Sequence, residues 1–337
     1  MSYTWFWELR RGRVSRIVRT IVTGEEARRQ YPARAVEILR DRLPGIDGWT
    51  PQALADRAVE MFWNGLSPRV RSWKSTQQLG RWINRRARRV QPRGGGCFTR
   101  FFRNMPQLEL VRDLLLEKPG EPPAKILSLG CSTGAELYSL LWLIRTARPE
   151  QGVQALGIDS AEECVQAASR GVYPFRVVEV AEVSDTSHER LFTSERKTLV
   201  VQDWLKDAVT WEVGDACSSD LVARFGQHDL VLANNFLCQM SPEGAEDCLR
   251  NLAQLVAPKG YLVVSGVDLD LRSRILEGLG FVPVTTKCAD IHAAEDRHAA
   301  WPLYSWGLEP MDRTRHDWAA RYATVFRSPV DTGGAPQ

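Results

Sequence analysis

The chain has 337 residues, a length that fits one large domain or, better, a main domain with a smaller one attached. Its composition, 44% hydrophobic and 25% charged, is that of an ordinary globular protein. No apolar run approaches the ~20 residues that span a bilayer, and the arginines near the N-terminus follow aromatic residues, an order unlike that of a signal peptide. We therefore expect a cytoplasmic protein with no membrane segment.

The seven cysteines and five histidines are scattered, and no two cysteines form a C-x-x-C pair. This spacing predicts reduced thiols rather than a disulfide framework, and it predicts no metal site.

The formal net charge of +3 hides an asymmetry between the two ends of the chain. Residues 1–100 carry 21 basic and 8 acidic side chains, a net charge of +13, so the remainder carries −10. Such a split indicates two units with different roles. We predict a basic helical N-terminal domain over residues 1–93, with helices around Val14–Ile21, after Thr50-Pro51 and around Trp82. The Pro92–Gly96 stretch is typical of a joint between domains.

Arginines gather in the third of these segments, between Arg81 and Arg93. A basic helix of this kind suits phosphate neutralisation, and so nucleic acid. It equally suits an acidic protein segment or substrate, or simple exposure to solvent. The residues alone leave these alternatives open.

The stretch 125–144, KILSLGCSTGAELYSLLWLI, organises the rest of the chain. Its first part is an apolar run of strand length, and Leu137, Leu140, Leu141 and Ile144 then recur at helical spacing. Between them lie small residues from Gly130 to Gly134, followed by Glu136. Strand, glycine turn and helix together present free backbone N–H groups and a helix N-terminus to a ligand.

The spacing of the glycines narrows the class of ligand. Gly130-x-x-x-Gly134 matches neither the G-x-G-x-x-G dinucleotide fingerprint nor a P-loop, and no lysine follows to neutralise a triphosphate. A carboxylate beside the turn suits a cationic or zwitterionic ligand such as S-adenosylmethionine (SAM). The alternative is a tight strand–helix turn that binds nothing.

Polar residues follow three further predicted strands. Asp159 ends a strand over Val153–Ile158 and can accept hydrogen bonds from a ribose diol, or cap the next helix. Asp215 ends a strand that begins at Trp211 and can accept from an adenine amino group, or sit in a plain turn. Asn234 and Asn235 end the strand that begins at His228. Carboxyl ends of parallel strands meet at one edge, so we expect these groups to lie together.

The remaining elements complete a class I methyltransferase-like (Rossmann-like) α/β sheet with helices on both faces, over residues 97–327. A helix over 108–115 precedes the first strand, and an insertion around 174–207 forms a small subdomain. We expect a helix over 244–256, a turn at Pro258–Gly260, a strand at 261–265, a helix at 272–279 and strands at 281–284 and 321–326. Residues 328–337 are predicted to be a flexible tail, and the segment from Trp306 to Trp318 has no familiar pattern.

Together, these segments resemble the CheR-type, SAM-dependent chemotaxis-receptor methyltransferases. The similarity runs from Cys97 to about Gly266, roughly half of the chain. Its motifs are TRFFR from Thr99, STGAELYS from Ser132, the stretch from Asp159 to Tyr173, HDLVLANNFL from His228 and PKGYL from Pro258.

The resemblance implies a role for each candidate residue. Thr99 and Arg103 would contact SAM, with Arg103 near the transferred methyl group, and Gly130 and Gly134 would form the turn. Glu136 would meet the methionyl ammonium and Asp159 the ribose. Asp215 and Ala216 would contact the adenine, and Asn234 and Asn235 would line the carboxyl end of the fourth strand.

Three positions depart from the family pattern: Asn234 replaces an arginine, Gln239 a tyrosine and Cys97 an asparagine. Gln239 would therefore stand beside the acceptor in place of a phenol. Because a carboxylate nucleophile needs no base, we expect carboxyl O-methylation, with Arg103 holding the acceptor. The acceptor would be an acidic protein segment or a carboxylate-bearing small molecule. Two alternatives stay open: a small-molecule methyltransferase of specialised metabolism, and a non-catalytic module that binds RNA or an acidic protein.

Overall fold

The computed structural model describes residues 51–90, 98–117, 123–174, 191–195 and 198–330. The chain divides into two compact units, residues 1–77 and 78–337. The helices expected after Thr50-Pro51 and around Trp82 are confirmed as α4 (Pro51–Gly65) and α6 (Lys74–Val90), with the short α5 (Pro68–Arg71) between them. The helix predicted around Val14–Ile21 lies outside the described residues.

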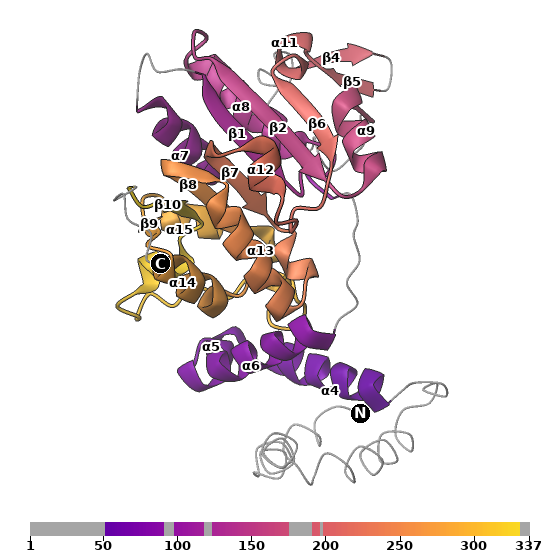
Figure 1. The fold of residues 1–337 in the computed structure, drawn as a ribbon. Helices are drawn as coiled ribbons and strands as arrows, with labels where there is room; N and C mark the ends of the chain where they lie inside the picture. Colours follow the sequence, from indigo (N-terminus) through magenta and orange to yellow (C-terminus); the bar gives the residue numbers. More distant parts are fainter. Residues whose placement is uncertain (1–50, 91–97, 118–122, 175–190, 196–197, 331–337) are drawn as a thin grey trace, which may run out of the picture. The chain divides into compact units, whose positions relative to one another are not determined.

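The larger unit is built on a seven-stranded sheet in the order β6-β2-β1-β7-β8-β10-β9 (Figure 1). Neighbours from β6 to β8 are parallel, and β10 runs antiparallel between β8 and β9. This is the α/β fold that the sequence predicted. The strands are β1 (Ala124–Leu129), β2 (Val153–Asp159), β6 (Val209–Val213), β7 (His228–Asn234), β8 (Val256–Ser265), β9 (Val282–Val284) and β10 (Val325–Arg327).

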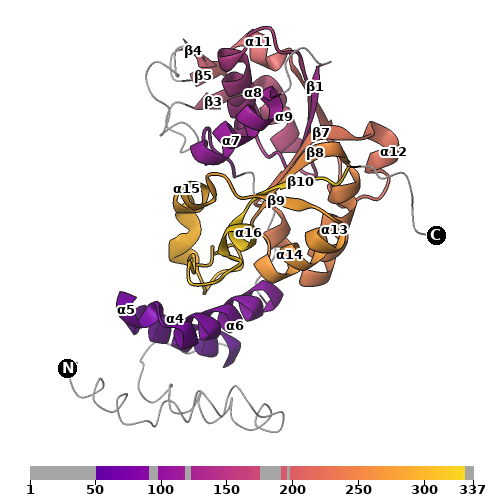
Figure 2. The same ribbon diagram turned by 90° about the vertical axis from the view of Figure 1, so that its left-hand side faces the viewer.

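Apolar residues on both faces of the strands divide the core into two layers. Ile126, Leu230 and Val263 pack with α7 (Met105–Leu116) and α8 (Ala135–Ala147). Their sequence neighbours, Leu127, Val231 and Leu262, point to the opposite face because side chains alternate along a strand. That face is covered by α12 (Leu221–Phe225), α13 (Pro242–Gln254) and α14 (Leu269–Gly278). Figure 2 shows α7 and α8 on one side of the strands and α12 and α13 on the other.

The order of the strands fixes where a ligand can bind. From β1 the chain moves outward through β2 to β6, and it then returns to place β7 on the other side of β1. The direction of winding thus reverses between β1 and β7. In open α/β sheets, the crevice at the carboxyl ends of two such strands is the usual ligand site.

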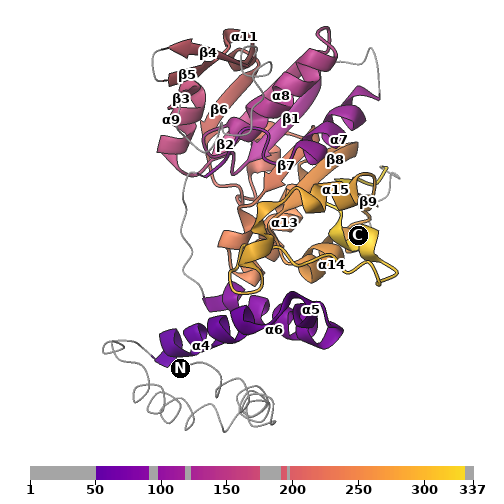
Figure 3. The same cartoon turned by 180° about the vertical axis from the view of Figure 1, so that it is seen from behind.

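A small antiparallel sheet, β3-β5-β4, lies beyond the β6 edge of the large sheet (Figures 1 and 3). Its strands are β3 (Val172–Pro174), β4 (Phe192–Glu195) and β5 (Thr198–Val201). They belong to the insertion that the sequence indicated, whose residues 175–190 lie outside the described ranges. Phe101 is fully buried here and meets the rings of Tyr173 and Phe192 edge to face, with centroids 5.0 and 4.8 Å away.

The end of the chain differs in part from the prediction. Residues 318–322 form the short helix α16 (Trp318–Tyr322), so the strand expected over 321–326 shrinks to β10 (Val325–Arg327). The turn expected at Pro258–Gly260 lies inside β8, where Lys259 adopts a positive φ of 62°. Ser328, predicted to begin a flexible tail, is buried, and its N–H donates to the Gly260 carbonyl at 2.8 Å.

Cys164 is disulfide-bonded to a residue outside the described ranges, so the expectation of reduced thiols is wrong at this position. Cys131, Cys217, Cys238, Cys248 and Cys288 are free thiols. Within the described ranges, no helix combines the length and apolarity needed to cross a membrane.

Candidate active site

The glycine turn joins β1 to α8 through three residues with positive φ. Gly130 has a φ of 61°, Ser132 of 52° and Gly134, the N-cap of α8, of 86°. A Cβ atom on Gly134 would lie 2.6 Å from the Trp211 ring, and one on Gly130 would lie 2.8 Å from the Phe236 ring. Both positions therefore need glycine for two reasons, the backbone conformation and the space.

Asp159 ties the end of β2 to this turn. One carboxylate oxygen accepts from the Ser132 N–H at 2.8 Å and the other from the Ala161 N–H at 3.0 Å. The N-cap of α9 (Glu162–Arg170) is Ala161, so Asp159 is not the cap of that helix. Each carboxylate oxygen has a second lone pair, which leaves Asp159 able to accept from a diol.

A chain of side-chain hydrogen bonds crosses the site from Thr324, just before β10, to Glu136 on α8. The Gln107 Nε2 atom donates to Thr324 Oγ1 at 2.7 Å, and its Oε1 atom accepts from Asn234 Nδ2 at 2.9 Å. The same Asn234 nitrogen donates to Glu136 Oε1 at 2.9 Å. Burial raises the pKa of Glu136, against the lowering effects of the Asn234 hydrogen bond and of the Arg103 charge. The network aligns Glu136 and Asn234 on one wall.

Arg103 faces that wall across a small cavity. The cavity is lined by Arg103, Asn104, Gln107, Leu108, Glu136, Asn234, Asn235 and Glu295. Desolvation lowers the pKa of Arg103, and an Asp296 carboxylate oxygen lies 3.9 Å from its Nη2 atom. The buried Arg103 Nε atom has no hydrogen-bond partner among the described residues. Arg103, Glu136, Asn234 and Asn235, predicted from sequence, are thus brought together.

The remaining residues predicted from sequence, Thr99, Asp215, Ala216 and Gln239, do not line this cavity. Thr99 is buried, and Ala216 is buried beside the exposed Asp215, whose Oδ1 atom accepts from the Cys217 N–H at 2.9 Å. The adjacent Gly214 N–H donates to the Asp159 carbonyl at 3.0 Å, which links that loop to the end of β2. Gln239 is exposed on the turn η2 (Leu237–Gln239) and does not line the cavity.

Three polar residues that line this cavity were not predicted from the sequence: Asn104, Gln107 and Glu295. Asn104 caps α7, and its Nδ2 atom donates to the Ile291 carbonyl at 2.9 Å and to Glu295 Oε1 at 3.3 Å. Asparagine two residues before proline is a helix-start signal that indicates this cap in the sequence. Glu295 has no such signal, because its partner Asn104 is 191 positions away and its other partner, Arg297, belongs to no motif.

The polar groups of the site fit SAM. Ser132 Oγ, Thr133 Oγ1 and Asn234 Oδ1 are buried without a hydrogen-bond partner among the described residues, an uncommon state that a polar ligand would relieve. Glu136 and Asn234 Oδ1 are acceptors suited to an ammonium group, and Asp159 is suited to a ribose diol. No part of this set matches a triphosphate, because the turn itself carries no cation.

The arginine-rich helix α6 uses part of its charge internally. Arg81 Nε pairs with Glu309 at 3.1 Å, and Arg88 is half-buried beside a second cavity. Arg85, Arg86 and Arg89 are exposed. A surface for a nucleic acid or an acidic partner would therefore rest on fewer arginines than the sequence suggested.

Comparisons with known proteins place this site in a family. A "Probable biofilm formation methyltransferase WspC" of Pseudomonas putida is 26% identical over 167 residues, covering 49% of this chain and 39% of that protein. A chemotaxis protein methyltransferase of Campylobacter jejuni is 26% identical over 174 residues, covering 51% and 63%. The chain thus spans less than two thirds of the length of these curated relatives.

Among solved structures, an O-methyltransferase family protein of Burkholderia thailandensis has a TM-score of 0.37 and 14% identity, covering 68% of this chain and 57% of that one, too weak a likeness to carry an argument. The family model described as CheR methyltransferase, SAM binding domain, matches residues 97–269, just over half of the chain. The resemblance read from the sequence motifs is confirmed: the chain belongs to the CheR methyltransferase family, and residues 97–269 are its SAM-binding domain.

Proposed function

We propose that this protein transfers a methyl group from SAM to a carboxylate oxygen of its acceptor. The observation that carries this proposal is the position of Arg103, which lines the same cavity as Glu136 and Asn234 and whose Nε atom has no hydrogen-bond partner among the described residues. A guanidinium with free donors beside the methionyl end of the cofactor site is a receptor for a carboxylate.

SAM, when bound, supplies an electrophilic methyl group on a sulfonium sulfur. Glu136 and Asn234 would hold the ammonium group and Asp159 the ribose, while Asp215 and Ala216 would lie at the adenine. Thr99 would support this site from within the core, and Gln239 would stand at its outer rim. Arg103 would orient the acceptor, whose oxygen lone pair forms the new C–O bond as the C–S bond electrons return to sulfur.

No general base is required for this reaction, because a carboxylate is already ionised at neutral pH. Positioning the oxygen in line with the methyl group supplies most of the rate enhancement. The two carboxylates that line the cavity, Glu136 and Glu295, already accept hydrogen bonds from Asn234 and Arg297, which disfavours their use as a base. An amine acceptor would need such a base.

The names of the relatives favour a protein acceptor, since one of them is called a chemotaxis protein methyltransferase. An acidic protein segment is therefore the first acceptor to test, with a carboxylate-bearing small molecule as the second. The three exposed arginines of α6, Arg85, Arg86 and Arg89, are suited to attract either one.

The first experiment measures binding of S-adenosylhomocysteine by calorimetry. Loss of two charge-assisted hydrogen bonds to the ribose predicts that Asp159→Ala weakens binding by about tenfold or more. Asp203→Ala, which changes an exposed carboxylate on α11 (Asp203–Lys206), is the matched control and should bind like the wild type. Absence of binding to the wild type would refute the proposal.

The second experiment identifies the bond that is formed. Cell extract is incubated with the protein and methyl-tritiated SAM, and the labelled product is treated with mild alkali. A carboxyl methyl ester releases volatile tritiated methanol, whereas a methyl group on nitrogen or carbon does not. Alkali-stable label would overturn O-methylation of a carboxylate, and the size of the labelled product separates a protein acceptor from a small molecule.

A further inference from the structure

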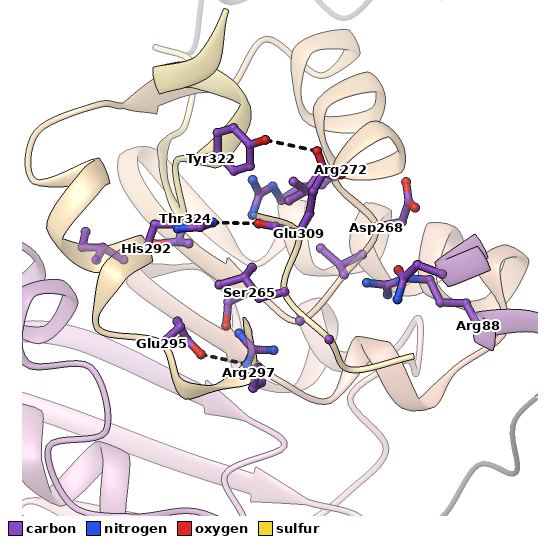
Figure 4. Close-up of a pocket in the computed structure, with 17 residues that line it drawn as sticks. Arg88, Ser265, Asp268, Arg272, His292, Glu295, Arg297, Glu309, Tyr322 and Thr324 are labelled. Carbon is purple, nitrogen blue, oxygen red and sulfur yellow. Dashed lines mark hydrogen bonds and ion pairs between the residues drawn. The ribbon is translucent and has the colours of Figure 1, made fainter. Parts of the chain in front are cut away.

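A second cavity, of about 40 Å³, lies beyond the first, and Glu295 lines both. Its walls are the end of β8 and the following loop (Ser265–Leu269), α6, α14, α15 (Cys288–Ala293) and the segment through η3 (Asp296–Ala300) to Glu309. Figure 4 shows Arg297 beside Glu295, and Arg88 approaching the cavity from α6 near Asp268. None of the motifs of the family passes through the segment from Glu295 to Glu309.

The carboxylates of this cavity already have partners. Glu295 accepts from Arg297 Nε at 2.7 Å and from Asn104 at 3.3 Å. Glu309 accepts from Arg321, Arg81 and the Tyr322 hydroxyl, at 3.2, 3.1 and 3.1 Å. Asp268 Oδ1 caps α14 through the Leu271 N–H at 3.0 Å. The cavity therefore has little capacity left for a cationic ligand.

The arginines, by contrast, have donors to spare. Arg297 is only 5% exposed, and its buried Nη2 atom has no partner among the described residues. Arg88 donates from Nε to Asn84 Oδ1 at 3.0 Å and forms no ion pair within the part of the chain that the structure describes. Burial lowers the pKa of Arg88, only partly opposed by Asp268. Arg272 is different, because its two terminal nitrogens donate to the Val264 and Arg321 carbonyls.

Two guanidinium groups with donors unused among the described residues, at one cavity whose acids are engaged, favour an anion there. We infer that this cavity binds a carboxylate group, held by Arg88 and Arg297. The planar guanidinium fork matches the two oxygens of a carboxylate, and the enclosed volume admits a group of that size rather than a bulky anion.

The position of the cavity gives this carboxylate a role. Glu295 lines both cavities, so the second cavity adjoins the one that holds Arg103. A molecule that reacts beside Arg103 can therefore reach the second cavity with a second acidic group. On the proposed function, the acceptor is then a diacid: one carboxylate receives the methyl group and the other is anchored here. Binding of the second carboxylate is testable without any methyl transfer.

The experiment uses isothermal titration calorimetry on the full chain saturated with S-adenosylhomocysteine. Succinate, a diglutamate peptide and inorganic phosphate are each titrated in at matched ionic strength. Arg88→Gln breaks no ion pair with a described residue, so we expect the fold to stay intact. Arg89→Gln removes an exposed charge one residue along the same helix. We expect succinate or the peptide to bind the wild type and Arg89→Gln, and to bind Arg88→Gln about tenfold or more weakly.

The source of the carboxylate follows from which probe binds. Succinate alone indicates a free diacid, and the diglutamate peptide alone indicates an acidic protein segment. Binding of neither, binding that is unchanged in Arg88→Gln, or binding of phosphate alone would overturn the inference. The affinity for S-adenosylhomocysteine, measured first in each sample, tests the proposed function separately. If the wild type does not bind S-adenosylhomocysteine, the proposed function is refuted. If it binds S-adenosylhomocysteine but no carboxylate, only the carboxylate site in the second cavity is refuted.

Discussion

The two cavities that meet at Glu295 are built in opposite ways. The first combines the carboxyl end of β7 with the start of α8, which a doubly wound sheet brings together, and with residues in and before α7. The second depends on specific long-range pairs, such as Arg81 with Glu309, 228 positions apart, and Asn84 with the Tyr304 carbonyl at 2.7 Å. One follows from topology and the other from individual side chains.

This difference has an energetic side. The first cavity is aligned by hydrogen bonds from the amide side chains of Gln107 and Asn234. The second is held by buried ion pairs, which cost desolvation energy when formed and strongly destabilise the fold when one partner is removed. We therefore expect variants that break an ion pair of the second cavity mainly to change stability, whereas variants that break none, such as Arg88→Gln, and variants of the first cavity mainly change ligand affinity.

The largest effect is expected for Arg321→Met. Arg321 pairs with Asp270 at 2.5 Å and with Glu309 at 3.2 Å, so the variant leaves Glu309 buried with less compensation. The free energy of unfolding, measured with urea, should fall by about 3–5 kcal/mol. Arg315→Met breaks the half-exposed pair with Asp317 and should cost about 1 kcal/mol or less. Equal losses in the two variants would contradict the contrast drawn between the cavities.

The next effect is a dependence of stability on pH. Burial lowers the pKa of His292 from 6.5 to about 4, and the Nε2 atom lies 2.9 Å from the Glu309 carbonyl. Between these values the unfolded chain binds a proton that the folded one does not, so stability falls as the pH drops from about 6.5 to 4, by up to ~3 kcal/mol. Urea unfolding of His292→Gln should show a shallower decline over this window. The exposed His316→Gln is the control.

A smaller loss is expected for Gly134→Ala at the glycine turn. The left-handed φ of 86° and the approach of the Trp211 ring to 2.6 Å from a Cβ atom predict a cost of about 1–3 kcal/mol. Gly278→Ala, where a Cβ atom meets nothing within 4 Å, should be neutral or slightly stabilising. Thermal unfolding measures both, and S-adenosylhomocysteine affinity should fall only in the first variant.

The smallest effect concerns Glu136. Because the pKa of Glu136 is raised, its ionised form is lost as the pH falls below that raised value, and binding of the ammonium group of S-adenosylhomocysteine should weaken in the same range. Glu136→Gln should bind about tenfold more weakly at neutral pH and lose this dependence. Calorimetry over a pH series makes the test, with the exposed Glu163→Gln as control. If the affinity of Glu136→Gln still depends on pH in this range, another titratable group causes the dependence.

The contrast between the two cavities also explains which parts of the molecule could be predicted from the sequence. The strands β1, β2 and β7, the helix α8 and the meeting of Glu136 with Asn234 follow from apolar periodicity and from the rule that parallel strands share an edge. Glu295 and Arg297 could not be found in this way, because neither belongs to a motif and only the fold brings their pair beside Asn104, 191 positions from Glu295.

Local preference also failed where tertiary contacts decide. The Trp318–Tyr322 stretch was predicted in part as strand, yet it forms α16, which carries Arg321 to its two carboxylates and places the Tyr322 hydroxyl 3.1 Å from Glu309. Asp215 was placed at a strand end, but β6 stops at Val213, and Asp215 lies in the following loop.

The position of β10 sets an order of events during synthesis. This strand lies between β8 and β9 in the sheet but follows both in the chain. Until residues 325–327 emerge, β8 presents an open edge and β9 has no strand to join, although most of the SAM-binding domain has already been made. Open edges pair readily with other chains. We expect the sheet to close only after residues 325–327 have been made, so that truncation before Val325 yields aggregation rather than a smaller folded domain.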